Sequence, residues 1–187
     1  MDAHVLVPVK TLDPKTRLAG ALTLQERVDL MTSLRTRVIA AVREAGIERI
    51  TVVANGPADP VDGEGIEVWL DRGLPWNEAL SAAAREVVTA PLVAFISADL
   101  PLLRADEVEQ LLAATPEEGI AIGRAHDGGT NAIAMRPPGL VLTHFGEPQS
   151  AGVHASLGVP YGLVDLPGLA FDVDTPDDLA RMRAQWV

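Results

Sequence analysis

Three cationic side chains, Lys10, Lys15 and Arg17, lie together shortly after an apolar run at 4–9. The run predicts a buried strand, and ligands of open α/β sheets collect beyond the carboxyl ends of strands. A lone lysine is usually a solvated surface charge, but this clustering favours binding of a phosphate chain. The loop has neither a G-x-x-x-x-G-K-[ST] nor a G-x-G-x-x-G pattern, so side chains would replace a glycine-rich cradle.

Acidic residues at two distant places predict a metal site. Asp99 follows the most continuously apolar segment, 92–97, and the stretch "FDVDTPDDL" supplies Asp172 and Asp174. We expect these two aspartates to point to opposite sides of the chain, so that only one faces the site. A helix start with Asp174 or Thr175 as N-cap accounts for Asp174. Asp172 is therefore the expected second ligand, with Asp174 as the alternative.

Other polar residues are candidates for substrate contact. Thr130 and Asn131 lie in "DGGTNA", which is also typical of an ordinary hairpin turn. Gly146 precedes an expected helix start at Ser150, where free backbone amides would bind an anion. Asn77 begins another helix, where it either caps the helix or contacts a purine base.

Composition limits the class of protein. The 187 residues have 48% hydrophobic content and predict one domain, 1–187. A net charge of −11 argues against extended nucleic-acid binding. The sequence has no cysteine, which favours a hard ion such as Mg²⁺ on oxygen ligands. Neither a membrane-length apolar stretch nor a signal peptide is found, so we expect a cytoplasmic protein without a membrane partner.

Apolar runs alternate with helical patterns, which predicts a mostly parallel mixed sheet with helices on both faces. Thr23 and Glu26 form a capping box before the longest helix, and Gly46 suits its end. A turn-rich loop is expected at 56–65. Strands are expected at 4–9, 49–55, 66–71, 92–97, 119–125, 131–136 and 159–165, the fifth and sixth as a small antiparallel insertion. Helices are expected at 24–45, 76–88, 105–115, 149–157 and from about Pro176.

Six stretches together resemble the 2-phospho-L-lactate / phosphoenolpyruvate guanylyltransferase family of coenzyme F(420) biosynthesis. That family is similar to the molybdenum-cofactor guanylyltransferases and to GT-A-like nucleotidyltransferases. The stretches are "VPVKTLDPKTRLAGALTLQER", "LPWNEAL", "SADLPLL", "GGTNAIAMRP", "FGEPQSAGVH" and "FDVDTPDDL", in the family's order over residues 5–179. The resemblance implies a three-layer α/β/α Rossmann-like fold. It also implies transfer of GMP from GTP to phosphoenolpyruvate or 2-phospho-L-lactate, with release of pyrophosphate.

The resemblance also implies a role for each candidate residue. Mg²⁺ would be held by Asp99 and one aspartate of "DVD". The nucleotide would be bound by Lys10, Lys15, Arg17 and Asn77, and the phosphorylated acid by Thr130, Asn131, Gly146 and Ser150. Lys10, Lys15, Arg17 and Asp99 would be the catalytic residues. A phosphate nucleophile already carries charge, so no general base is needed, and His154 is expected to be a surface or half-buried histidine.

Two alternatives remain open in the sequence. The acceptor could be 3-phosphoglycerate, a molybdopterin or a sugar phosphate, although relatives acting on the last two usually begin with a glycine-rich loop that is missing here. From another class, the chain could be a non-catalytic nucleotide-binding α/β module. Guanine preference rests on the resemblance, and the sequence leaves the oligomeric state open.

Overall fold

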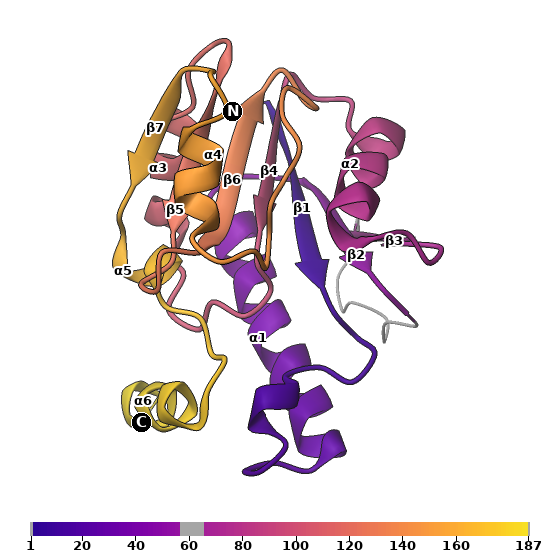
Figure 1. The fold of residues 1–187 in the computed structure, drawn as a ribbon, viewed down its shortest axis with the longest axis vertical. Helices are drawn as coiled ribbons and strands as arrows, with labels where there is room; N and C mark the ends of the chain where they lie inside the picture. Colours follow the sequence, from indigo (N-terminus) through magenta and orange to yellow (C-terminus); the bar gives the residue numbers. More distant parts are fainter. Residues whose placement is uncertain (1, 57–65, 187) are drawn as a thin grey trace.

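The computed structural model describes residues 2–56 and 66–186, so the turn-rich loop expected at 56–65 lies, from residue 57 on, outside the described residues. Figure 1 shows a sheet with helices on both sides. The strands are β1 (Ala3–Val9), β2 (Arg49–Ala54), β3 (Ile66–Leu70), β4 (Leu92–Ile96), β5 (Gly119–Arg124), β6 (Thr130–Arg136) and β7 (Tyr161–Val164). The helices are α1 (Leu24–Glu44), α2 (Trp76–Val87), α3 (Ala105–Ala113), α4 (Ser150–Ala155), α5 (Pro167–Ala170) and α6 (Pro176–Gln185), with a 3₁₀ helix η1 (Thr16–Leu18).

The described strands form one seven-stranded sheet in the order β3-β2-β1-β4-β6-β5-β7. β1 pairs in parallel with β2 and β4, and β5 pairs in parallel with β7. β6 lies between β4 and β5 and is antiparallel to both. The mostly parallel mixed sheet is therefore confirmed. The expected antiparallel pair is built into the sheet itself, between β4 and β7, and β6 brings its first residues to the edge at which β1 and β4 end.

Alternation of side chains along the strands divides the core into two layers. Val5 and Val7 of β1 pack in one hydrophobic cluster with α1, α3 and α6, whereas Leu6 packs in another with α2 and α4. Phe95 of β4 and Ile133 of β6 join the second cluster. In Figure 1, α1 lies behind the sheet and α4 in front of it. This is the expected three-layer α/β/α arrangement.

The helix boundaries follow the sequence signals. Thr23 and Glu26 make the expected reciprocal capping box at the start of α1, and Gly46 adopts a φ of 76° just after its end. Thr175 rather than Asp174 caps α6, with Pro176 in its first turn. The short helices η1 and α5 were not predicted.

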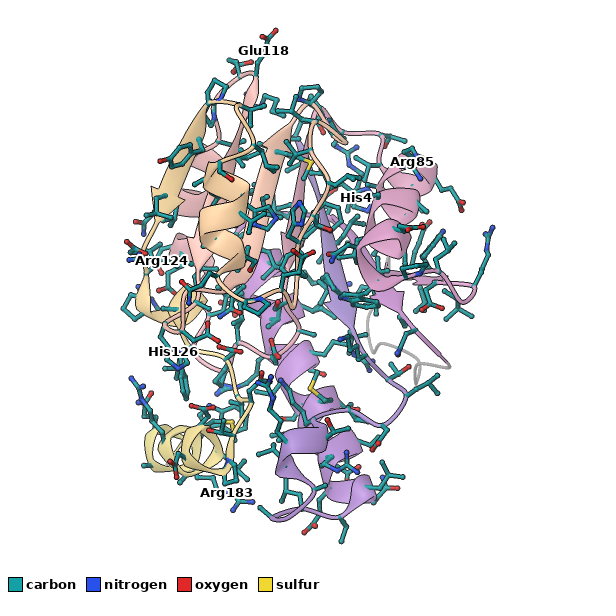
Figure 2. All side chains as sticks on the ribbon, viewed as in Figure 1. His4, Arg85, Glu118, Arg124, His126 and Arg183 are labelled. Atoms are coloured by element: carbon teal, nitrogen blue, oxygen red, sulfur yellow. The ribbon has the colours of Figure 1, made fainter. Side chains whose placement is uncertain are left out.

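Charged side chains lie mainly at the surface, and the buried histidine His4 has a hydrogen-bond partner. Figure 2 shows Arg85 and Glu118 at the periphery of the molecule, while His4 lies inside it. The His4 ring lies 2.9 Å from the Thr51 hydroxyl, measured from Nε2 to Oγ1, so this buried imidazole is paired across β1 and β2. In the described part of the chain, every helix is too short or too polar to cross a membrane.

Candidate active site

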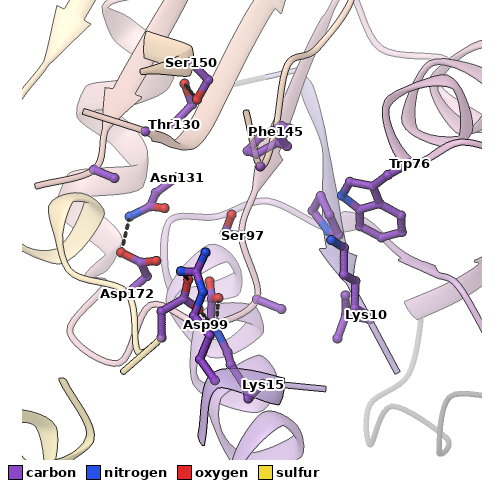
Figure 3. Close-up of a pocket in the computed structure, with 18 of the residues that line it drawn as sticks. Lys10, Lys15, Trp76, Ser97, Asp99, Thr130, Asn131, Phe145, Ser150 and Asp172 are labelled. Atoms are coloured by element: carbon purple, nitrogen blue, oxygen red, sulfur yellow. Dashed lines mark hydrogen bonds and ion pairs between the residues drawn. The ribbon is translucent and has the colours of Figure 1, made fainter. Parts of the chain in front are cut away.

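A cavity of about 660 Å³ opens at the edge of the sheet where β1 and β4 end and β6 begins. The close-up in Figure 3 shows Lys15 and Asp99 on one side, Lys10 and Trp76 on another, and Thr130 with Ser150 at the far wall. Its lining includes ten of the candidate residues: Lys10, Lys15, Arg17, Asp99, Thr130, Asn131, Gly146, Ser150, Asp172 and Asp174.

Asp99, Asp172 and Asp174 form a carboxylate cluster, with one oxygen of each lying within 4.8 Å of the others. The backbone N–H of Val173 donates to the carbonyl of Asp99 at 3.3 Å, which lays the "DVD" segment beside the end of β4. The expectation that only one of Asp172 and Asp174 faces the site is wrong. In an extended chain, residues two apart share a face, so both aspartates face the cavity while Phe171 and Val173 are buried in the core.

The ammonium of Lys15 lies inside the carboxylate cluster. It pairs with Asp99 and, at 2.7 Å, with Asp174, and its side chain is only 7% exposed. Burial by itself lowers the pKa of Lys15, but attraction and hydrogen bonds from Asp99 and Asp174 outweigh it and raise the pKa above its ordinary value. Lys15 is therefore a fixed positive charge between two carboxylates.

The other two cations are more open to solvent. The Arg17 guanidinium is 3.1 Å from Asp174, measured from Nη1 to Oδ2, and its side chain is 72% exposed. The Lys10 ammonium lies 5.8 Å from the centre of the Trp76 ring, away from the carboxylate cluster. The structure thus brings Lys15 and Arg17 together and places Lys10 on another wall of the same cavity.

The carboxylate cluster has the donor set and charge that suit a divalent metal. Burial, with repulsion from Asp99 and Asp174, raises the pKa of Asp172 to about 6. Oδ1 of Asp99 is buried and has no hydrogen-bond partner among the described residues. Three carboxylates against the charges of buried Lys15 and exposed Arg17 leave net negative charge that a hard cation would offset.

Two side chains hold in place the loop 10–17, which carries the three cationic residues. Arg27 of α1 is buried and donates to the carbonyl of Pro14 at 2.6 Å, and it pairs with Asp13 at 2.7 Å. Asn55, at the end of β2, accepts from the backbone N–H of Thr11 at 2.7 Å. Neither role was predicted from the sequence, although Arg27 is four residues before the buried Met31, on the stripe that faces the core.

The wall opposite the carboxylates carries the polar groups expected to bind the acid. Thr130 and Ser150 are hydrogen bonded to each other, with 3.0 Å between their hydroxyl oxygens. The Asn131 amide donates to the carbonyl of Leu169 at 2.9 Å and to Asp172 at 3.3 Å, so it supports the cluster. The expectation of free amides at the start of α4 is not met, because the N–H of Ala151 donates to the carbonyl of Gly128, and the next two amides bond to that of Gln149.

Asn77 was expected either to cap α2 or to contact a purine base. Its side chain does not cap the helix, and Asn77 is not among the residues that line the cavity. Its Oδ1 accepts from the N–H of Phe145 at 2.9 Å and from the hydroxyl of Thr143 at 3.0 Å, and its Nδ2 donates to the carbonyl of Phe145. Asn77 therefore holds the segment before Gly146 against α2. Its neighbour Trp76 lines the cavity instead.

Comparisons with known proteins agree with this geometry. A family model described as "Guanylyl transferase CofC like" matches residues 3–183. The chain is 36% identical over 192 aligned residues to the phosphoenolpyruvate guanylyltransferase of Sphaerobacter thermophilus. That alignment covers 97% of this chain and 93% of the relative. The chain is 34% identical over 183 residues to the 2-phospho-L-lactate guanylyltransferase of Haloarcula marismortui, with 96% and 84% covered. A nucleotidyl transferase from Methanothermobacter has a similar fold, with a TM-score of 0.71 at 15% identity over 99% of this chain and 97% of that one.

The two guanylyltransferase relatives, each more than 30% identical over nearly the whole chain, place it among the nucleotidyltransferases, and its cavity lined by cations and carboxylates agrees with that class. Within that class, the chain belongs to the guanylyl transferase CofC-like family. The resemblance carried by the six sequence stretches is thereby confirmed. An enzyme is favoured over the non-catalytic nucleotide-binding module that the sequence left open.

Proposed function

We propose that this protein transfers GMP from GTP to a small phosphorylated acid, phosphoenolpyruvate or 2-phospho-L-lactate, and releases pyrophosphate. The relatives named above carry these two acids in their names. In this proposal residues 1–187 act as one nucleotidyltransferase domain. The observation that carries the proposal is the meeting of Lys15, Arg17 and the three carboxylates on one side of a cavity whose other wall presents the Thr130 and Ser150 hydroxyls.

In this proposal Asp99, Asp172 and Asp174 would hold Mg²⁺. The unpartnered buried oxygen of Asp99 and the raised pKa of Asp172 support this assignment. Bound there, Mg²⁺ would neutralise charge on the phosphate oxygens and help to orient them.

The reaction joins two anions. A phosphate oxygen of the acceptor forms a bond to the α-phosphorus of GTP, and the bond from that phosphorus to the bridging oxygen breaks. The bridging oxygen keeps the electron pair and leaves as part of pyrophosphate. Because the nucleophile is already ionised, the barrier is mainly electrostatic, and positioning with charge neutralisation lowers it. Lys10 and Arg17 line the cavity with exposed side chains and would neutralise the polyphosphate, while buried Lys15 pairs with Asp99 and Asp174.

Steady-state release of pyrophosphate tests the proposal. GTP with Mg²⁺ should release pyrophosphate only when an acceptor is present, and phosphoenolpyruvate or 2-phospho-L-lactate should be preferred over 3-phosphoglycerate and sugar phosphates. ATP and CTP provide the comparison for the base. Equal release without an acceptor would indicate a nucleotide hydrolase instead.

A further inference from the structure

Behind the cavity wall formed by Thr130 and Ser150 lies a histidine that the proposed reaction does not use. His154 is 1% exposed, Thr130 6% and Ser150 0%. Ser150 and His154 are one turn apart on α4, and Thr130 is the first residue of β6. The three side chains form a continuous hydrogen-bonded group that reaches the cavity from the core side.

The backbone fixes which ring nitrogen of His154 carries the proton. The N–H of His144 points at Nε2 of His154 at 3.0 Å, and a backbone N–H can only donate. Nε2 must therefore offer its lone pair, and the proton of the neutral ring is on Nδ1. That nitrogen lies 3.0 Å from Oγ1 of Thr130, so His154 donates to the threonine hydroxyl. The ring cannot act as a general base at the cavity because both nitrogens are already used.

The hydroxyl protons can then be counted. Thr130 accepts from His154, and one proton is shared in the hydrogen bond between Thr130 and Ser150. Two hydroxyls carry two protons, so one proton remains, and the described residues offer no acceptor for it. If Ser150 donates to Thr130, the remaining proton belongs to Thr130; in the reverse case it belongs to Ser150. Thr130 lines the cavity and is 6% exposed, whereas Ser150 is 0% exposed. The arrangement in which Ser150 donates to Thr130 therefore presents the remaining proton to whatever binds there.

We propose that His154 is a positioning residue that keeps the Thr130–Ser150 hydroxyl pair oriented as a hydrogen-bond donor toward an anionic group of the acceptor acid. This inference rests on the proposed function and adds to it a residue that acts through Thr130 without touching substrate. A donor at this wall suits a carboxylate or phosphate oxygen, which accepts only. Burial, with repulsion from His144, lowers the pKa of His154 to about 4, which agrees with a neutral ring.

A matched pair of substitutions tests this role. In His154→Asn the side-chain amide stands near the position of Nδ1 and can still donate to Thr130. In His154→Gln the amide reaches the position of Nε2, where it can bond the His144 N–H but leaves Thr130 without its donor. We expect His154→Gln to raise the KM for the acceptor by about tenfold to hundredfold, the range for a hydrogen bond to a charged group. We expect His154→Asn to stay within about threefold of the wild type, and the KM for GTP to be unchanged in both.

Thr130→Val provides the second arm. It removes the hydroxyl through which His154 acts, so it should raise the acceptor KM as His154→Gln does, and the double variant should be no worse than the poorer single variant. His144→Asn is the control, because it keeps the backbone N–H that fixes His154 and should leave the acceptor KM within about twofold. Additive losses in the double variant, or equal losses in His154→Asn and His154→Gln, would overturn the proposal.

A spectrum of the intact protein tests the geometry without turnover. Long-range ¹H–¹⁵N correlations should show His154 protonated at Nδ1 and bare at Nε2 at neutral pH. A proton on Nε2, or a charged ring, would refute the positioning role even if every variant misfolded. Absence of acceptor-dependent turnover in the wild type would instead count against the proposed function, so the two failures are distinguishable.

Discussion

The Lys15 ammonium occupies a place among carboxylates where a metal would also bind, so it competes with any cation for the same oxygens. We expect Lys15→Met to bind Mn²⁺ or Mg²⁺ in the absence of nucleotide at least about tenfold more tightly than the wild type, since a neutral side chain leaves the carboxylates uncompensated. Calorimetric titration with the metal alone measures this.

Lys10→Met is the matched control for that titration. Lys10 lines the same cavity but lies over Trp76 rather than between the aspartates, so its loss should leave the affinity for the metal alone within about twofold. Unchanged or weaker metal binding in Lys15→Met would mean that the ammonium does not compete for the carboxylates.

The neutral state of buried His154 gives a stability effect with a definite sign. Its pKa falls from the ordinary 6.5 to about 4, so the unfolded chain binds more protons than the folded one between these values. The stability contribution is complete above pH 6.5 and is lost as pH falls toward 4, by at most about 1.4 kcal/mol per pH unit for one proton. His144, with a ring centroid 5.4 Å away, and Glu147, which attracts the charged form, also face it.

Urea unfolding of the wild type and His154→Gln at several pH values measures that effect. The free energy of unfolding of the variant should fall less steeply between pH 6.5 and 4 than that of the wild type, because glutamine does not titrate. Two parallel curves would show that His154 does not titrate differently in the folded and unfolded states.

At the scale of single residues, the sequence predicted ten residues of the cavity lining but not how they are held in place. Residue type and position after a strand were enough to predict Lys15 and Asp99 as lining residues, and the need for a second carboxylate was enough for Asp172. The role of Asn77 could not be predicted, because its partners are the backbone of Phe145 and the hydroxyl of Thr143, which only the tertiary fold brings near. Hydrogen bonds to distant backbone leave no pattern in a sequence.

At the scale of elements, α3 and α5 together position the segment that leads to Asp172. The buried carboxylate of Glu107 accepts from the N–H of Gly168 at 2.8 Å, and a Cβ on Gly168 would meet that carboxylate and lie 2.6 Å from the carbonyl of Leu102. We expect Gly168→Ala to lower the free energy of unfolding by about 1–3 kcal/mol, the usual cost of overpacking. The affinity for metal should fall as well, because the Asn131 amide donates both to the carbonyl of Leu169, next to Gly168, and to the carboxylate of Asp172.

Gly152→Ala is the control for that substitution. Gly152 is exposed in α4, and a Cβ added to it would meet no atom of another element within 4 Å, so alanine there should stabilise the helix by up to about 1 kcal/mol. Chemical denaturation of both variants measures the two effects. A Gly168→Ala protein as stable as the wild type would mean that α3 and α5 are not tightly packed.

The long elements could be predicted and the short ones could not. Periodicity over 24–45 and the capping signals at Thr23 and Thr175 fixed the main helices, because many residues contribute to each pattern. η1 and α5 contain three and four residues, too few for a period to emerge. The central position of β6 depends on pairing with β4, a long-range contact that local sequence does not encode.

At the scale of the whole molecule, the net charge is −11, so a bound nucleotide depends on the local cations and on the metal for positive charge. Binding of GTP with Mg²⁺ should stabilise the folded chain by about 2.7 kcal/mol when the ligand concentration is about one hundred times its dissociation constant. For a chain of this size, that corresponds to a rise in Tm of roughly 5–10 °C. Differential scanning fluorimetry measures the shift.

Asp99→Asn should lose most of the metal-dependent part of that shift, whereas Asp29→Asn, on the exposed surface of α1, should retain it. A shift that is the same with Mg²⁺ and with a chelator would contradict metal binding at the carboxylate cluster.

The most direct test of GMP transfer follows the oxygens. Phosphoenolpyruvate labelled with ¹⁸O in its phosphate is incubated with GTP, Mg²⁺ and the enzyme, and the products are weighed by mass spectrometry. Attack by an acceptor phosphate oxygen on the α-phosphorus predicts a joined guanylyl product that retains every ¹⁸O atom, together with unlabelled pyrophosphate. Label in the pyrophosphate, or free GMP with no joined product for either proposed acid, would contradict the account.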